Sequence, residues 1–114
     1  MATVDLNEFG EVVLDGSGNG TVKIGPLSDR EVWSPAIAFV QASSAGKEAI
    51  ATVYMGHDTS NSYKVDASFA GSSGDSTARV AGRTVRSGQY VLCTWTGGDP
   101  GATAILTVNG TKDV

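Results

Sequence analysis

The feature of this chain that most constrains its fold is the alternation of apolar and polar residues near its C-terminus. Two segments with this period-two pattern, Gln89–Thr96 and Ala102–Val108, flank the polar run Gly97–Gly101. Their β-branched and aromatic residues are typical of strands, and the Gly, Asp and Pro between them are typical of turns. The pattern predicts a β-hairpin. Its inward-facing residues would be Val91, Cys93, Trp95, Ala104, Leu106 and Val108.

Similar short segments recur along the rest of the chain. Glu11–Leu14 and Thr21–Ile24 predict a first hairpin, and Ala49–Met55 predicts a further strand. Val32–Val40 predicts a longer strand, in which Pro35 indicates a bulge or a sheet edge because proline has no backbone N–H to donate. Residues 70–77 are rich in Gly and Ser and predict an exposed loop. Seven to eight short antiparallel strands result, and they predict an all-β, single-domain, jelly-roll-like β-sandwich.

The N-terminal segment differs from the rest of this pattern. A chain of 114 residues is long enough for one domain with one core. Residues 1–10 are interpreted as an N-terminal arm or an edge strand, and residues 11–114 as the β-sandwich domain. Val4, Leu6 and Phe9 on this segment are candidate contacts with a partner subunit.

Charge and composition exclude several classes of partner. The net charge is −4 and the eight basic residues are scattered, so we expect no nucleic-acid binding through phosphates. No apolar run is long enough for a membrane span, and the N-terminus lacks the pattern of a signal peptide. We therefore expect synthesis in the cytosol and no membrane partner. The single cysteine, Cys93, excludes an intrachain disulfide and is expected to be buried.

No set of residues in the sequence indicates catalysis or a cofactor. The only histidine, His57, is expected in a loop, and no serine lies in a nucleophile-elbow motif. One cysteine and one histidine are too few for a zinc site. Calcium remains a minor alternative, because several aspartates fall in or beside predicted loops, although no dense Asp array is present. These aspartates are Asp15, Asp58, Asp66, Asp75 and Asp99. We expect no enzyme activity, no cofactor and no metal.

The aromatic residues suggest a second kind of function. β-Sandwiches that bind carbohydrate present aromatic side chains to the sugar, so Tyr54, Tyr63 and Tyr90 are candidate glycan contacts. Trp95 lies within an apolar alternation and is expected in the core.

The run Trp95-Thr-Gly-Gly-Asp-Pro-Gly-Ala102 is the most specific motif of the chain. Further motifs are Gly25-Pro26, Glu31-Val32-Trp33, Ala51–Gly56, Asp75-Ser76, Ser87–Val91, Thr103-Ala104, Leu106–Val108 and Gly110-Thr111. With these motifs, residues 25–111 resemble a family of small structural proteins of tailed bacteriophages that infect actinobacteria.

The resemblance implies a non-enzymatic virion component that assembles with capsid or tail subunits and forms homo-oligomers. Two locations stay open, decoration of the capsid exterior and a minor tail position. The alternative function is a carbohydrate-binding adhesion module for host cell-surface glycans, and a virion protein can combine both roles.

Overall fold

The computed structural model describes residues 2–43, 46–59, 69–71, 75–79 and 83–114, and these residues form an all-β sandwich. Six longer strands make up the body of the two sheets, and two short strands extend one edge of each sheet. The longer strands are β1 (Thr3–Val13), β2 (Gly20–Ile24), β3 (Val32–Ala42), β4 (Ala49–Gly56), β7 (Tyr90–Thr96) and β8 (Thr103–Asp113). The short strands are β5 (Phe69–Gly71) and β6 (Asp75–Arg79), so parts of the predicted loop 70–77 are strand instead.

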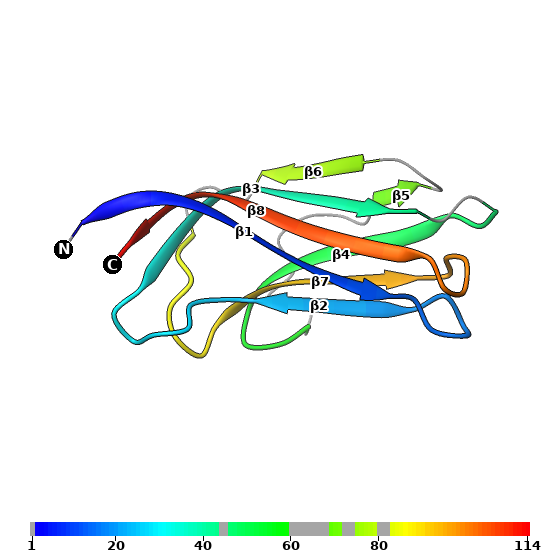
Figure 1. Ribbon diagram of the computed structural model, residues 1–114, viewed down its shortest axis with the longest axis horizontal. Helices are drawn as coiled ribbons and strands as arrows, with labels where there is room; N and C mark the ends of the chain where they lie inside the picture. The colour runs from blue at the N-terminus through cyan, green and yellow to red at the C-terminus, as the bar shows by residue number, and fades with distance from the viewer. Residues whose placement is uncertain (1, 44–45, 60–68, 72–74, 80–82) are drawn as a thin grey trace.

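The strand order is that of a jelly roll. One sheet has the order β1-β8-β3-β6 and the other β2-β7-β4-β5, with every neighbouring pair antiparallel. The pairs β1–β8, β2–β7, β3–β6 and β4–β5 run inward from the two chain ends, as if one long hairpin had been wrapped into two layers (Figure 1). This arrangement of two packed sheets confirms the predicted all-β, jelly-roll-like sandwich.

The two predicted hairpins are wrong as pairings, although their strands form. β7 pairs with β2 and β4, whereas β8 pairs with β1 and β3 in the other sheet. β1 and β2 are likewise in different sheets. Each connection therefore crosses from one layer to the other instead of turning back within a sheet. Alternation shows which face of a strand is buried, but it does not distinguish a strand beside it from a strand across the core.

The core lies between the sheets and follows the predicted alternation. Val91, Cys93 and Trp95 of β7 are buried, and so are Ala104, Leu106 and Val108 of β8. They share one cluster with residues of the remaining long strands. Burial raises the pKa of the Cys93 thiol far above its ordinary value, because the thiolate would lose its hydration there.

The predicted irregularity at Pro35 is a register shift in β3. Pairing with β8 moves from Pro35↔Gly110 to Ile37↔Asn109, so Ala36 is extra. Burial changes phase across the shift, since Trp33 and Pro35 are buried before it and Ala38 and Val40 after it. Gly110 makes the bulge possible. A Cβ atom there would lie 2.8 Å from the backbone nitrogen of Ala36.

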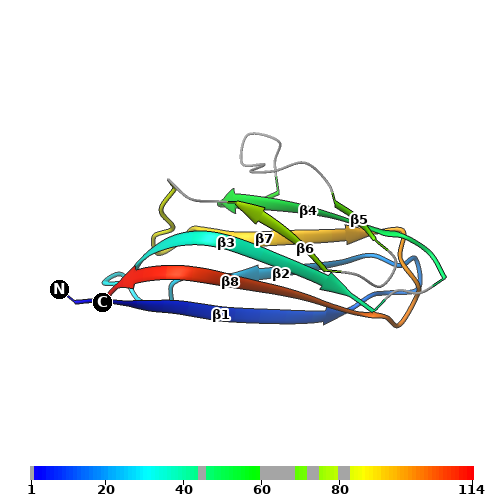
Figure 2. The ribbon, with the colours of Figure 1, turned by 90° about the horizontal axis from the view of Figure 1, so that it is seen from above.

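The sandwich is elongated, with principal extents of 47 × 24 × 21 Å. Its two termini lie together at one end, where Val114 N donates to Ala2 O at 3.0 Å (Figure 2). The predicted arm 1–10 has no separate boundary in the structure, because residues 3–10 belong to β1 and pair with β8 over their whole length. β1 occupies the edge of its sheet.

Candidate functional site

The three N-terminal residues predicted to contact a partner fall on two faces of β1. Leu6 is 2% exposed and belongs to the core, so its assignment as a partner contact is wrong. Even-numbered residues of β1 point inward, because Leu6 is in the core and alternate residues of a strand share a face. Val4 is exposed near the end of this inner face, and Phe9, on the outer face, is 66% exposed.

Phe9 lies on the outer face of the β1-β8-β3-β6 sheet. It lies opposite Thr107 of β8, which in turn lies opposite Phe39 of β3, so the three side chains form one cross-strand row. Ile37 and Ile105 are on the same face, one step along their strands, and Ile37 is 41% exposed. We call Phe9, Ile37, Phe39 and Ile105 the outer patch. The sequence predicted only Phe9, because the other three residues lie in strands whose alternate residues form the core.

Acidic residues surround the N-terminal side of the outer patch. Asp5 and Glu11 lie two residues away from Asn7 and Phe9 on the same face of β1, and Glu8 lies between them on the inner face. Self-pairing of two β1 edges would bring these like charges together across an antiparallel ladder, which is unfavourable. The charge of this edge therefore disfavours association of two copies through pairing of their β1 strands.

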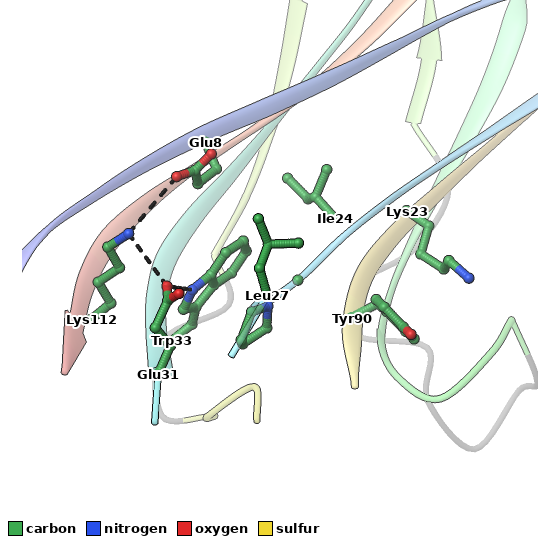
Figure 3. A pocket seen from close by; sticks show the side chains of 10 residues that line it. Glu8, Lys23, Ile24, Leu27, Glu31, Trp33, Tyr90 and Lys112 are labelled. Atoms are coloured by element: carbon green, nitrogen blue, oxygen red, sulfur yellow. Dashed lines mark hydrogen bonds and ion pairs between the residues drawn. The ribbon is translucent and has the colours of Figure 1, made fainter. Parts of the chain in front are cut away.

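A concave site lies between the sheets near the termini. A cavity of about 540 Å³ is bounded by β1 and β8 on one side and by the end of β2 and the β2–β3 connection on the other. Its lining residues are Glu8, Lys23, Ile24, Gly25, Pro26, Leu27, Glu31, Trp33, Tyr90 and Lys112 (Figure 3). We call this cavity the end pocket.

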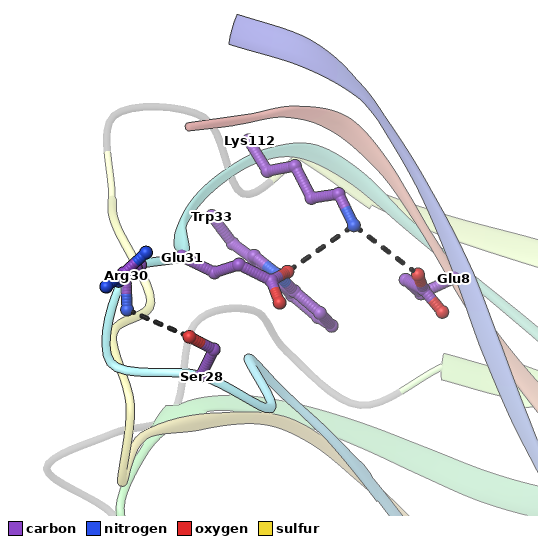
Figure 4. A network of polar contacts seen from close by, with 6 residues as sticks. All are labelled: Glu8, Ser28, Arg30, Glu31, Trp33 and Lys112. Atoms are coloured by element: carbon purple, nitrogen blue, oxygen red, sulfur yellow. Dashed lines mark hydrogen bonds and ion pairs between the residues drawn. The ribbon is translucent and has the colours of Figure 1, made fainter. Parts of the chain in front are cut away.

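A polar network forms one wall of the end pocket. Lys112 Nζ lies 3.4 Å from Glu31 Oε1 and 3.9 Å from Glu8 Oε1. Trp33 Nε1 donates to the same Glu31 oxygen at 3.2 Å (Figure 4). The β2–β3 connection holds Glu31 in place, because Glu31 N donates to Ser28 O at 3.1 Å. The sequence did not predict this site, since its three polar residues come from segments that are distant in the chain.

Two of the candidate glycan tyrosines, Tyr54 and Tyr90, lie diagonally across the β4–β7 pair on the outer face of their sheet, because Tyr54 pairs with Leu92 and Gly56 with Tyr90. Tyr54 and Tyr90 are half-buried on neighbouring strands of the β2-β7-β4-β5 sheet. Lys23 Nζ lies 4.4 Å from the centroid of the Tyr90 ring and covers one of its faces. Tyr63 lies outside the described residues.

The titratable residues of the described segments form no cluster that could hold a metal ion. No group of three or more His, Cys, Asp or Glu side chains that could hold a metal ion occurs among these residues. Asp15 accepts hydrogen bonds from Ser17 N at 2.8 Å and Asn19 N at 3.0 Å, which lowers the pKa of its carboxyl. His57 Nδ1 lies 2.9 Å from Gly88 O. Within the same segments, no helix is long and apolar enough to cross a membrane.

The Trp95–Ala102 run comprises the last two residues of β7 and the β7–β8 connection, at the end of the molecule opposite the termini (Figure 1). Gly98 N donates to Gly18 O at 3.0 Å, which joins this loop to the β1–β2 turn. Asp99 Oδ2 accepts from Gly46 N at 2.7 Å, which joins it to the β3–β4 connection. The most specific motif of the sequence therefore holds three crossing loops together, and this role accounts for its glycines and its aspartate without a ligand.

Comparison with known proteins gives weak structural similarities. No protein-family model and no curated protein matches the chain. Among solved structures, it is similar to those of the infectious bursal disease virus Gx and Gt strains. The identities are 12% and 10%, the TM-scores 0.34 and 0.31, and the matches cover 97% of this chain. The chain spans about a third of the length of these structures, 31% and 32%. A TM-score this low does not establish a shared fold.

Proposed function

We propose that this protein is a non-enzymatic structural component of a virion, which assembles with other virion subunits through the outer patch. The observation that carries the proposal is the exposure of Phe9 and Ile37 on the outer face of a sheet whose inner face already forms the core. Large apolar side chains exposed on one face of a folded domain are a feature of interaction surfaces. The patch presents side chains for contact but no catalytic group.

Two further observations support a virion role. The jelly roll is an architecture that viral capsid domains use, although lectin domains use it as well. The Trp95–Ala102 run resembles structural proteins of actinobacterial tailed phages, and its loop is well defined here by contacts with Gly18 and Gly46. Because a fold alone does not assign a function, the exposed residues of the outer patch support an assembly role more strongly than the jelly roll does. We propose a location on the capsid exterior or in the tail, with subunits of the particle and further copies of the chain as partners.

Point substitutions test this proposal better than truncation. Deletion of residues 1–10 would remove most of β1 and the core residue Leu6, so loss of assembly would follow from unfolding alone. Ile37→Asp places a charge in the outer patch, while Ile50→Asp is a matched control. Ile50 is the same residue type and is 44% exposed, but it lies on β4 in the other sheet.

The measurement is incorporation of each variant into particles assembled by the genome that encodes the chain, with thermal unfolding of the purified variants as a check on folding. We expect Ile37→Asp and Phe9→Asp to lose at least about tenfold in incorporation, since a charge in an apolar contact costs more than 1.4 kcal/mol. Ile50→Asp should incorporate like the wild type. Normal incorporation of folded Ile37→Asp and Phe9→Asp variants would refute the outer patch as the assembly surface.

A further inference from the structure

The end pocket has two walls of different chemistry. Glu8 of β1, Lys112 of β8 and Glu31, at the end of the β2–β3 connection, form a charged wall. Ile24 and Leu27 form an apolar wall opposite to it, and Leu27 is 98% exposed (Figure 3). A ligand that fills the space between them must have a polar edge and an apolar face.

The charged wall retains hydrogen-bonding capacity beyond its own contacts. An ammonium carries three donors and a carboxylate about four acceptor positions. Lys112 directs two contacts to carboxylates, and those of Trp33 and Lys112 with Glu31 fall on the same oxygen, Oε1. At least one donor and several acceptor positions of this wall are therefore available to a ligand. Alternating donors and acceptors over a short distance are suited to hydroxyl groups, each of which both donates and accepts.

The charges that line the end pocket exclude strongly ionic ligands. Glu8 and Glu31 offset Lys23 and Lys112, so the lining side chains sum to zero charge. A phosphate or nucleotide would need a positive excess, and a polycation would need a negative one. Lys23 also covers a face of Tyr90, which directs a ligand toward the Trp33 side of the cavity.

We propose that the end pocket binds a neutral saccharide, with hydroxyl groups on the Glu8–Lys112–Glu31 wall and the C–H face of the ring against Ile24 and Leu27. A volume of about 540 Å³ is within the range of small-ligand sites. The site is independent of the outer patch. It also differs from the tyrosine set expected from the sequence, because its polar contacts come from Glu8, Glu31 and Lys112.

The test is a titration of ¹⁵N-labelled full-length protein with glucose, galactose, mannose and N-acetylglucosamine, each followed by NMR. The indole N–H of Trp33 reports on the pocket, and that of the buried Trp95 is an internal reference. We expect at least one of these sugars to shift the Trp33 signal with a dissociation constant on the order of 1 mM. The Trp95 signal should stay in place.

Variants separate binding from folding. Lys112→Met keeps an apolar stem but removes the ammonium, and it should weaken binding at least about tenfold. Leu27→Asn alters a fully exposed residue, so it leaves the fold intact and should also weaken binding. Glu11→Gln, on the outer face of β1, is the control and should bind like the wild type.

Three outcomes would overturn the proposal. The first is the absence of a Trp33 shift with all four sugars. The second is an equal loss of binding in Lys112→Met and Glu11→Gln, and the third is a stronger response of the pocket to trilysine peptide than to any sugar. Ile37→Asp should leave sugar binding unchanged, so this test does not depend on the assembly test.

Discussion

The two ends of the sandwich use their polar groups in different ways. At the end opposite the termini, the β1–β2, β3–β4 and β7–β8 connections bind one another through backbone and Asp99 hydrogen bonds. At the end that holds the termini, Glu8, Glu31 and Lys112 line a cavity, and Leu27 is exposed at its rim. We call the first the closed end, because its loops are bonded to one another, and the second the open end, because its polar side chains line a cavity. Substitutions at the closed end should therefore change stability, and those at the open end should change binding.

The largest effect is expected for Gly18→Ala at the closed end. Gly18 has φ of +76°, a conformation unfavourable for alanine, and an added Cβ would overlap the carbonyl of Gly98. We expect a loss of about 3 kcal/mol in the free energy of unfolding, measured by urea denaturation. Gly16→Ala is the matched control in the same turn, because a Cβ there meets no atom within 4 Å. Equal losses of stability in both variants would show that the contact between the two loops does not determine the effect of Gly18→Ala.

Asp99→Ala should have the second largest effect. It removes the carboxylate that accepts from Gly46 N at 2.7 Å, and a hydrogen bond to a charged group contributes about 1.5–3 kcal/mol. Since the site is partly open to solvent, we expect the free energy of unfolding to fall by about 1.5 kcal/mol, measured by urea denaturation. Asp29→Ala in the exposed β2–β3 connection is the control and should change stability by less than about 0.5 kcal/mol. If Asp29→Ala lowered the free energy of unfolding more than Asp99→Ala, the closed end would not be the more stabilising of the two ends.

Glu8→Gln at the open end should change stability much less. The Glu8 side chain is about half exposed, and its oxygen lies 3.9 Å from Lys112 Nζ, so the ion pair is screened by water. We expect the free energy of unfolding to fall by less than about 0.5 kcal/mol, and we expect this difference to disappear in high salt. Denaturation curves at low and high ionic strength measure it. A loss comparable to that of Asp99→Ala would mean that the open end is also a structural element.

The smallest effect concerns pH and the β1–β2 turn. The backbone donors Asn19 N and Ser17 N lower the pKa of Asp15 below its ordinary value of 3.8. The folded state therefore binds this proton less readily than the unfolded state, and the stabilisation is present above about pH 4. It is lost as the pH falls through the lowered pKa.

Asp15→Ala should accordingly be slightly less stable than the wild type at pH 6, and the gap should narrow as the pH falls below 3.8. Urea denaturation across this range measures the gap. A gap that stays constant down to pH 2 would assign the effect to turn geometry instead of to the charge of the carboxylate.

Local sequence rules predicted the faces of the strands but not their partners. Val91, Cys93 and Trp95 are buried as the alternation requires, because side chains of a strand alternate between its two faces whatever lies next to it. The same rule placed β7 and β8 in one hairpin, which is wrong. The Gly97–Gly101 loop has five residues of turn type, and such a loop can either reverse within a sheet or cross to the other layer. Contacts with Gly18 and Gly46, distant in sequence, accompany the crossing.

The bulge near Pro35 in β3 likewise had one part that residue type predicted and one part that strand pairing decided. Pro35 predicted an irregularity because a missing N–H is a property of one residue. Its partner Gly110 was not predicted, since the need for a glycine there arises only when β8 lies against β3.

The sequence predicted only one residue of the outer patch. Exposure of Phe9 followed from its position beyond the clear strands, but Leu6 beside it is core, because β1 is a full edge strand and one of its faces covers the other sheet.

The sequence by itself determined the all-β class, the buried faces and the absence of a disulfide, since these depend on residue type and on a period of two. Only the tertiary structure decided the strand pairing, the outer patch and the end pocket. Each of them joins residues from opposite ends of the chain, as in the contact of Glu8 with Lys112, and no local pattern encodes which distant segments meet.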